Sequence, residues 1–365
     1  MPSTPSSPAV ALKQVLEDMA VEGELYETLD DGRLLCYACG HECKIPDGRP
    51  GVCRVRYNAG GQLHVPSGYV STIAVDPIEK KPFFHAFPGR DALSFGMLGC
   101  DLHCAYCQNW VTSQTLRDDR AVSRVHQVAP DRVADLAIEN RAPVVASTYN
   151  EPLITTEWAM QIMRPAVERG LIGAYVSNGN ATRRVLNYIR PYVSLYKVDL
   201  KTFSDREYRR LGGQLDNVKR TIRQLFEMEF WVEIVTLIVP GLNDSDDELK
   251  QMADFLVGIS PDIPWHVTAF HSDYKMRQTP STQVAQLIHA CEIGAAAGLR
   301  YIYAGNLPGM VGDWEHTRCP RCRTICIERQ GFMIRSNRLV GGNCPDCAEP
   351  IAGFWGGDDR VPAQP

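Results

Sequence analysis

The spacing of the cysteines constrains this chain more than any other feature of its sequence. Of its 13 cysteines, all but Cys291 fall into three compact groups. The chain starts Met1-Pro2-Ser3 without a basic segment leading into an apolar core, so we expect no signal peptide and a cytoplasmic location. An odd number of cysteines in such a chain argues against a disulfide framework. The groups therefore predict metal or catalytic sites, and Cys291 is expected to be a small buried side chain.

The length and composition are those of a globular protein. With 365 residues, 44% of them hydrophobic and 22% charged, the chain can form a core of roughly 200–250 residues with appendages. A net charge of −5 does not indicate a polyanionic partner, so nucleic-acid binding is not expected from composition. The longest apolar stretch, Phe230–Leu242, is interrupted by Glu233, so no membrane span is expected.

From Asp91 onward, short apolar runs alternate with helical patterns. The runs predict strands that are covered on both faces, at Leu93–Leu98, Pro143–Thr148, Leu171–Ser177, Ser194–Leu200, Phe230–Val239, Trp265–Phe270 and Leu299–Tyr303. Pro130 and Pro280 are expected at first helical positions, and Ser204 and Ser245 each start a capping-box pattern. Such alternation predicts parallel strands with crossover helices, in a full or partial β/α barrel or an open doubly wound sheet.

The cysteine groups divide the chain into modules. We expect an N-terminal Cys-rich module and linker over 1–90, the alternating β/α core over 91–314, and a C-terminal Cys-rich module over 315–356. Residues 357–365 are expected to be a tail. Within the linker, Asp76–Phe87 either packs its aromatic side chains on the core or brings Lys80, Lys81 or His85 to substrate.

The central group, Cys100, Cys104 and Cys107, is the most informative motif. Its C-x3-C-x2-C spacing directly follows the first strand of the alternating region. Three cysteines on a compact loop can hold three irons of a [4Fe–4S] cluster and leave the fourth open to an external ligand. The alternative is a structural zinc site with His103 as the fourth ligand.

This motif resembles the signature of the radical S-adenosylmethionine (SAM) enzymes, including the aromatic Tyr106 before the last cysteine. The resemblance implies a partial (β/α) TIM-type barrel in which the open iron binds SAM. One electron from the cluster then cleaves SAM to a 5′-deoxyadenosyl radical, which abstracts hydrogen from a substrate. It also implies an electron donor such as flavodoxin or ferredoxin.

Polar segments after successive predicted strands lie where this family places SAM contacts. Tyr149-Asn150-Glu151-Pro152 resembles its Gly-Gly-Glu-Pro-like segment, with Tyr-Asn in place of the glycines, and Ser177-Asn178-Gly179 resembles its Thr-Asn-Gly segment. Asp199-Leu200-Lys201 is similar to the Asp-x-Lys of the activase-like branch. The resemblance therefore implies SAM contacts at Tyr106, Asn150, Glu151, Ser177, Asn178, Asp199, Lys201 and His271.

Over roughly residues 30–356 the chain looks like the radical enzyme of the AmmeMemoRadiSam system, a relative of pyruvate formate-lyase activating enzyme. The stretches that support this include Cys36–Cys43, Asp76–Pro82 and Cys107-Gln108-Asn109-Trp110. The resemblance implies an oxygen-sensitive cytoplasmic enzyme that works with Memo-type and AMMECR-type partner proteins. It supplies no substrate.

The two outer cysteine groups each offer four thiolates. Cys36, Cys39, Cys43 and Cys53 suit zinc or a second [4Fe–4S] cluster, and free thiols or shared ligands remain open. The two C-P-x-C knuckles predict a zinc ribbon, or else a rubredoxin-like iron site, with ligands Cys319, Cys322, Cys344 and Cys347. The residues between, Ile325–Arg335, alternate as a hairpin would, and Cys326 is expected to be a spare thiol.

Three functions remain from the sequence. The first is a radical SAM enzyme acting on a small molecule or modified macromolecule of the AmmeMemo-linked pathway. The second is an activase that generates a glycyl radical on a partner protein. The third is a non-enzymatic zinc protein that binds RNA or protein, for which the arginines of the last module, such as Arg321 and Arg335, would provide positive charge.

Overall fold

The computed structural model describes residues 8–356. The predicted tail at 357–365 and the Pro/Ser-rich start of the chain lie outside these residues. Contacts within the chain divide it into two compact units. The first contains the chain up to Val75, Leu93–Val193 and Leu211–Gly213, and the second contains Asp76–Ala92, Ser194–Arg210 and the chain from Gln214 onward.

The first unit begins with a helix and small antiparallel sheets. Helix α1 (Pro8–Asp18) precedes a three-stranded sheet of β1 (Ala20–Glu22), β6 (Gln62–Pro66) and β5 (Tyr57–Ala59). A second sheet is formed by β2 (Tyr26–Thr28), β3 (Leu34–Cys36) and β4 (Lys44–Ile45). A two-stranded pair joins β7 (Tyr69–Val70) and β10 (His126–Gln127). These short strands position the first cysteine group, because Cys36 ends β3.

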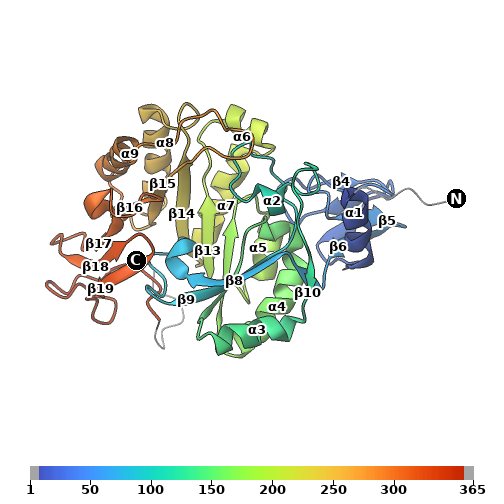
Figure 1. Ribbon diagram of the computed structural model, residues 1–365, viewed down its shortest axis with the longest axis horizontal. Helices are drawn as coiled ribbons and strands as arrows, with labels where there is room; N and C mark the ends of the chain where they lie inside the picture. Colours follow the sequence, from blue (N-terminus) through green and yellow to red (C-terminus); the bar gives the residue numbers. More distant parts are fainter. Residues whose placement is uncertain (1–7, 357–365) are drawn as a thin grey trace. The chain divides into compact units, whose positions relative to one another are not determined.

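The rest of the first unit has the predicted strand–helix alternation. Its strands lie in the order β12-β11-β9-β8, with bounds Ile172–Ser177, Val144–Ser147, Asp91–Gly96 and Thr72–Pro77. Strands β11 and β12 are parallel and start in register at Val144 opposite Ile172. Helices α3 (Pro130–Glu139) and α4 (Thr156–Glu168) lie side by side (Figure 1), and both pack on β11. The remaining helical segments are α2 (Trp110–Ser113), η2 (Pro152–Thr155) and α5 (Arg183–Ile189).

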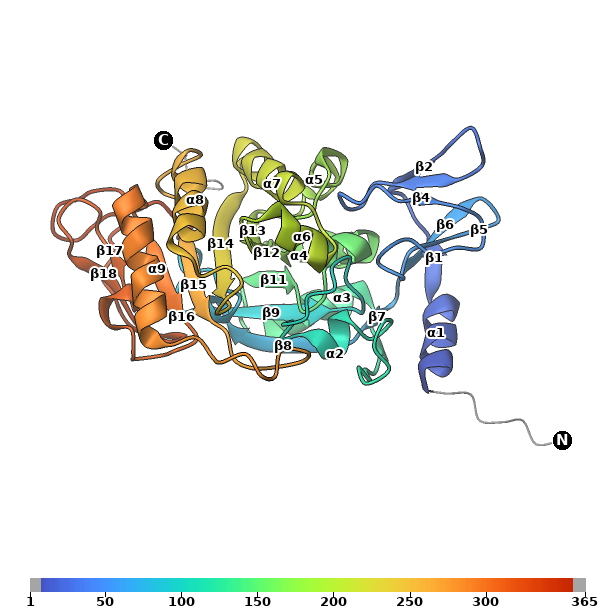
Figure 2. The same cartoon turned by 90° about the horizontal axis from the view of Figure 1, so that it is seen from above.

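The second unit contains the later strands of the alternation. Strands β13 (Leu195–Asp199), β14 (Trp231–Ile238), β15 (Trp265–Ala269) and β16 (Ile302–Gly305) are all parallel. Its helices include α6 (Asp205–Leu211) and α7 (Leu215–Glu227). Helices α8 (Asp246–Val257) and α9 (Val284–Ala297) lie side by side, and α9 covers β15 and β16 (Figure 2). Each predicted strand after Asp91 is present within a few residues of its predicted bounds.

The helix starts follow the sequence signals with one exception. Pro130 is the first residue of α3, and Ser245 caps α8 by accepting a hydrogen bond from the Glu248 amide. The prediction for Pro280 was wrong, because α9 starts at Val284. Thr282 explains the difference: its hydroxyl donates to the carbonyl of Ile238 at 2.5 Å and accepts from the Phe270 amide at 3.0 Å. These bonds connect Thr282 to the ends of β14 and β15. They keep the chain around Thr282 extended, so the helix begins only after this residue.

The last part of the second unit is an antiparallel sheet. It contains β17 (Thr317–Arg318), β18 (Ile325–Gln330) and β19 (Met333–Asn337), preceded by a 3₁₀ turn at Gly312–Glu315. The hairpin predicted at Ile325–Arg335 is therefore present. Cys326, 0% exposed, packs with Phe84, Tyr303 and Ile327 in a buried cluster beneath this sheet.

The linker residues Phe84 and His85 are part of the core of the second unit. The Glu233 carboxylate accepts hydrogen bonds from the amides of both residues at 2.9 Å. The His85 ring is hydrogen-bonded to the Ala352 carbonyl at 2.5 Å and to the Tyr303 hydroxyl. His85 is therefore buried structure, and the packing interpretation of the linker is the correct one for these two residues.

The described elements form an α/β fold with a mostly parallel central sheet, as a partial TIM-type barrel does. None of the helices between residues 8 and 356 is long and apolar enough to cross a bilayer.

Candidate functional site

The loop that carries Cys100, Cys104 and Cys107 leaves the carboxyl end of β9 and ends at α2. Cys104 is buried and the other two cysteines are partly exposed. The Leu102 amide lies 3.4 Å from the Cys100 sulfur, and the Ser113 hydroxyl lies 3.1 Å from the Cys107 sulfur. The loop thus presents three thiols, two of them with a hydrogen-bonding group beside the sulfur, and this donor set suits three irons of a [4Fe–4S] cluster.

Side chains farther along the chain hold this loop in place. The Arg117 guanidinium donates to the carbonyl of Cys100 at 2.6 Å and to that of Val52 at 2.5 Å. The Gln114 amide donates to the Leu102 carbonyl at 3.1 Å. Gly99, at φ +93°, is closely approached by the first cysteine module, since a Cβ atom there would lie 2.8 Å from Val55. The loop conformation therefore depends on residues on both sides of it.

The absence of a side chain at Gly212 leaves room for the imidazole ring of His103. The His103 amide donates to the Leu211 carbonyl at 2.9 Å. A Cβ atom on Gly212 would lie 2.4 Å from Cε1 of the His103 ring, and Gly212 has a φ of +87°. The ring therefore lies directly over the backbone of the Leu211–Gly213 segment.

The segment after β11 turns sharply although it lacks the family's two glycines. Tyr149 adopts a left-handed φ of +71°, which costs a non-glycine residue about 1 kcal/mol. A Cβ on Gly96 would lie 2.6 Å from the Thr148 carbonyl, so the neighbouring strand supplies the missing space. The Asn150 side chain accepts from the Met97 amide at 2.9 Å and thereby connects the turn to the start of the cysteine loop.

Glu151 joins the carboxyl ends of β11 and β12. Its buried carboxylate accepts hydrogen bonds from the Ser177 hydroxyl at 2.7 Å, the Asn178 amide at 2.8 Å and the Leu153 amide at 3.1 Å. Burial, together with the nearby charge of Asp101, raises the pKa of Glu151 to about 8. The structure thus brings together Asn150, Glu151, Ser177 and Asn178, which the sequence predicted as SAM contacts, next to the cysteine loop.

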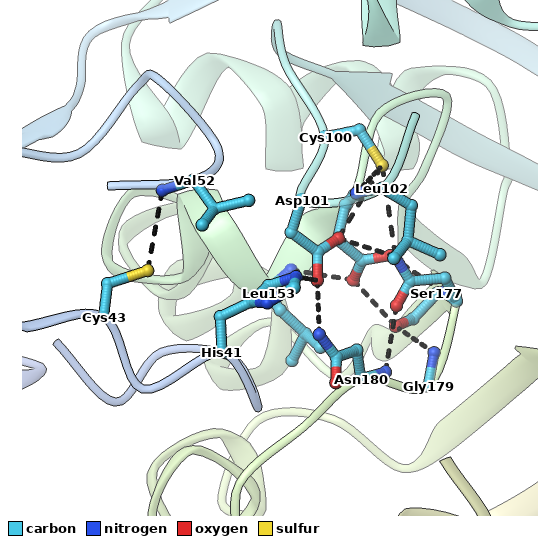
Figure 3. A network of polar contacts seen from close by, with 12 residues as sticks. His41, Cys43, Val52, Cys100, Asp101, Leu102, Leu153, Ser177, Gly179 and Asn180 are labelled. Carbon is cyan, nitrogen blue, oxygen red and sulfur yellow. Dashed lines mark hydrogen bonds and ion pairs between the residues drawn. The ribbon is translucent and has the colours of Figure 1, made fainter. Parts of the chain in front are cut away.

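Asp101 is a member of this group that the sequence analysis missed. Its carboxylate accepts a hydrogen bond from the side-chain amide of Asn178 at 2.6 Å. It accepts a second from the side-chain amide of Asn180 at 2.8 Å (Figure 3). The His41 ring, from the first cysteine module, lies 3.7 Å from the same carboxylate. The sequence signal was an acidic residue between two cysteines of the predicted cluster loop, and no neighbouring residue in the sequence indicated which partners its carboxylate would have.

The other predicted SAM contacts lie in the second unit, where β13 and β15 run parallel on either side of β14. Asp199 ends β13, and its carboxylate pairs with Lys197 and, at 3.4 Å, with Lys201. Burial opposes ionisation of Asp199, but the charges of Lys197 and Lys201 lower its pKa overall. His271 follows the carboxyl end of β15 and is exposed.

The N-terminal cysteines are mostly buried. Cys36, Cys39 and Cys53 are each less than 10% exposed, and the Cys43 sulfur lies 3.5 Å from the Val52 amide. Burial, followed by the charges of Asp101 and Cys36, raises the pKa of Cys39, and burial raises that of Cys53 to about 12. Burial disfavours the thiolate form of these cysteines. A bound metal ion would stabilise that form, because it supplies the positive charge that a buried thiolate needs.

The C-terminal cysteines have the geometry of a compact metal site. The ligand atoms of Cys319, Cys322, Cys344 and Cys347 all lie within 4.8 Å of one another. The sulfur pairs Cys319–Cys347 and Cys322–Cys344 are each 3.5 Å apart. This is too long for a disulfide and close to the spacing of four thiolates around one zinc ion. Hydrogen bonds with Thr324 lower the pKa of Cys322 to about 6, which favours the thiolate.

Comparisons with known proteins show what the chain is similar to. Residues 96–256 match the model of the radical SAM superfamily. The chain is 33% identical over 334 residues to the uncharacterised protein MJ0808 of Methanocaldococcus jannaschii, which covers 90% of this chain and 98% of that protein. It is 21% identical over 183 residues to the pyruvate formate-lyase-activating enzyme of Staphylococcus epidermidis, covering 47% of this chain and 72% of the relative. Among solved structures, Streptococcus suis SuiB matches at 14% identity and a TM-score of 0.47, over 64% of this chain and 52% of SuiB.

Proposed function

From the premise that this chain belongs to the radical SAM superfamily and is an enzyme, we propose that Cys100, Cys104 and Cys107 hold a [4Fe–4S] cluster with one iron open to SAM. The observation that carries this proposal is that the Cys100 thiol, on the same loop as the other two cysteines, lies 4.0 Å from the side-chain amide of Asn178, which belongs to the hydrogen-bonded group around Glu151. When bound, the reduced cluster would supply the electron for cleavage of SAM, and the 5′-deoxyadenosyl radical so formed would abstract hydrogen from the substrate.

The residues of the chain bind and orient the cofactors in this proposal. In the first unit we assign SAM contacts to Tyr106, Asn150, Glu151, Ser177 and Asn178. Both Glu151 oxygens already accept hydrogen bonds, so Glu151 also fixes the ends of β11 and β12. In the second unit we assign Asp199, Lys201 and His271, of which Asp199 and Lys201 bear opposite charges suited to the ammonium and carboxylate of an amino acid.

The test is anaerobic reconstitution of the wild-type protein and of variants with each of the three cysteines changed to alanine. The wild-type protein is expected to gain a cluster of about four irons at this loop and to release 5′-deoxyadenosine from SAM after reduction. Each alanine variant is expected to lose that release, while Cys326→Ala keeps it. Release of 5′-deoxyadenosine by all three variants would disprove the assignment.

We propose that the substrate is a small molecule or modified macromolecule of the AmmeMemo-linked pathway, with Memo-type and AMMECR-type proteins as partners. The support is the resemblance over residues 30–356, which includes both cysteine-rich ends of the chain. Co-purification of the tagged enzyme with each partner candidate, with the S. epidermidis type of activating enzyme as a control bait, tests this proposal. Equal recovery on both baits would count against it.

The similarity to pyruvate formate-lyase-activating enzyme favours a second candidate, an activase that forms a glycyl radical on a partner protein. Deuterium transfer from a deuterated glycine of the partner into 5′-deoxyadenosine would establish this reaction. The non-enzymatic zinc protein is not retained, because the chain is a radical SAM enzyme.

For the outer groups we propose zinc at Cys319, Cys322, Cys344 and Cys347, where the sulfurs are close enough to share one ion. Cys36, Cys39, Cys43 and Cys53 hold zinc or a second [4Fe–4S] cluster in this proposal, and metal analysis separates the two. We also propose a cytoplasmic location and an electron donor such as flavodoxin or ferredoxin. The proposed location is supported by the described cysteines, none of which forms a disulfide, as suits a reducing compartment.

A further inference from the structure

A buried carboxylate lies beside the cysteine loop, and its position suggests a role of its own. Asp101 directly follows Cys100 and is 0% exposed. One of its oxygens, Oδ1, lies 3.7 Å from the Cys100 sulfur. Figure 3 shows the two side chains next to each other, with Asn180 and His41 on the far side of the carboxylate.

The contacts of Asp101 are those of an ionised carboxylate. The side-chain amide of Asn178 donates to Oδ1 at 2.6 Å and that of Asn180 donates to Oδ2 at 2.8 Å. An NH₂ group can only donate, so both oxygens act as acceptors, as they do in a carboxylate. The ring of His41 lies 3.7 Å from Oδ2 and extends this polar contact to the first cysteine module.

A negative charge in this position acts strongly on the electronic state of a cluster bound at Cys100. Charges in a protein interior interact through a lower effective dielectric constant than charges in water. Reduction adds one electron, which a neighbouring anion opposes. The potentials of iron–sulfur clusters follow the net charge and the hydrogen bonding around their ligands. The two amide donors offset part of the negative charge of Asp101, because the positive ends of their N–H dipoles point at the carboxylate.

We propose that Asp101 is a positioning residue that lowers the reduction potential of the cluster at Cys100, and that Asn178 and Asn180 set how strongly it does so. A lower potential makes the reduced cluster a stronger donor of the electron that SAM receives. The inference rests on the proposed function, since it needs the cluster to be held at Cys100, Cys104 and Cys107.

The competing explanation is a purely structural role, in which Asp101 only ties the end of β12 and the first cysteine module to the loop. The two roles differ in what happens to the potential. If Asp101 acts through its charge, removing the charge and removing a donor to that charge shift the potential in opposite directions. If Asp101 has only a structural role, both changes loosen the loop, and the potential is expected to shift in the same direction in both.

The experiment is a potentiometric titration of the reconstituted full-length protein without SAM, followed by electron paramagnetic resonance of the reduced cluster. The variants are Asp101→Asn and Asn180→Ala. Asp101→Asn keeps the shape of the side chain, and the Asn180 amide can turn over to present its oxygen to the new NH₂ group. The control is Asp135→Asn, which removes the same charge from the exposed surface of α3.

At the wild-type midpoint, we expect the ratio of reduced to oxidised cluster to rise about tenfold in Asp101→Asn, a shift of about 59 mV for one electron. It is expected to fall in Asn180→Ala and to stay unchanged in Asp135→Asn. A midpoint of Asp101→Asn at or below that of the wild type overturns the proposal. If Asp101→Asn retains no iron, Asn180→Ala decides: a lower midpoint supports the proposal, and an unchanged or higher one overturns it.

The result separates this inference from the proposed function. A wild-type protein without a [4Fe–4S] signal that responds to SAM would contradict the proposed function. A wild-type protein that titrates normally beside unshifted variants would contradict the role of Asp101 alone.

Discussion

Arg56 and Glu157 form a buried bidentate ion pair, in which Nη1 and Nη2 of Arg56 lie 2.6 Å and 2.7 Å from the two carboxylate oxygens of Glu157. Arg56 belongs to the cysteine-rich N-terminal part and Glu157 to the start of α4, and both are almost inaccessible to water. The same carboxylate accepts from the amides of Glu24 and Leu25. The pair therefore fastens the first cysteine module to the helix layer of its own unit.

The pair gives the first prediction. Changing Arg56 to Met leaves the Glu157 carboxylate buried without a countercharge, and we expect a loss of about 3–5 kcal/mol of unfolding free energy. The measurement is chemical denaturation under anaerobic conditions. Arg33→Met is the control, because its pair with Asp31 is exposed to solvent and is expected to contribute little to stability. Equal losses in the two variants would contradict the role assigned to the buried pair.

The contact between His103 and Gly212 gives the second prediction. Gly212→Ala places a Cβ atom within 2.4 Å of the His103 ring, so the cysteine loop must shift and cluster content is expected to fall severalfold. Gly170→Ala is a matched control, because Gly170 has a similar φ of +84° but nothing within 4 Å of an added Cβ. Iron and sulfide analysis after reconstitution measures the difference. Similar cluster contents in the two variants would mean that the ring tolerates the added methyl group.

Glu79 gives a prediction of pH dependence. It is 0% exposed, its Oε1 accepts from the Gly89 amide at 2.8 Å, and burial raises its pKa to about 7. A raised pKa means that the folded state holds the proton more tightly than the unfolded state. The stabilisation is therefore complete below the unfolded pKa of about 4.3 and is lost as the pH rises through about 7.

Glu79→Gln removes this dependence while it keeps an acceptor for Gly89. We expect the variant to be more stable than the wild type at pH 8, and the difference to shrink as the pH is lowered to 5. Denaturation curves at a series of pH values measure it, with the exposed Glu139→Gln as control. A constant difference between variant and wild type across this range would show that Glu79 does not titrate there.

The C-terminal ribbon gives the fourth prediction. Cys344→Ala is expected to remove about one zinc per chain and to make the segment between Thr317 and Gly356 sensitive to protease, since the two cysteine pairs are then no longer joined through the metal. Cys326→Ala should keep the metal, because the Cys326 sulfur lies 3.7 Å from the Thr324 carbonyl and belongs to the buried cluster under the sheet. Elemental analysis and limited proteolysis check both. Loss of zinc from Cys326→Ala would mean that the ligand set has been assigned incorrectly.

The strands and most helix starts could be predicted because their signals are local. An apolar run such as Phe230–Val239 specifies a buried strand wherever its neighbours lie, and Ser245 caps a helix that begins at the next residue. Pro280 shows the limit of such signals. It is followed by Thr282, which is held by the ends of two strands, and these distant contacts outweighed the local preference for a helix start.

The sequence by itself determined the cysteine groups and hence the kind of chemistry, because metal ligands on one loop are close together through the covalent chain. Only the tertiary structure decided what surrounds them. Asp101 gains its surroundings from Asn178 and Asn180, which are 77 and 79 residues away, and from His41 in another module. The physical reason is that burial and charge depend on which segments fold against the loop, and a local pattern of residues does not carry that information.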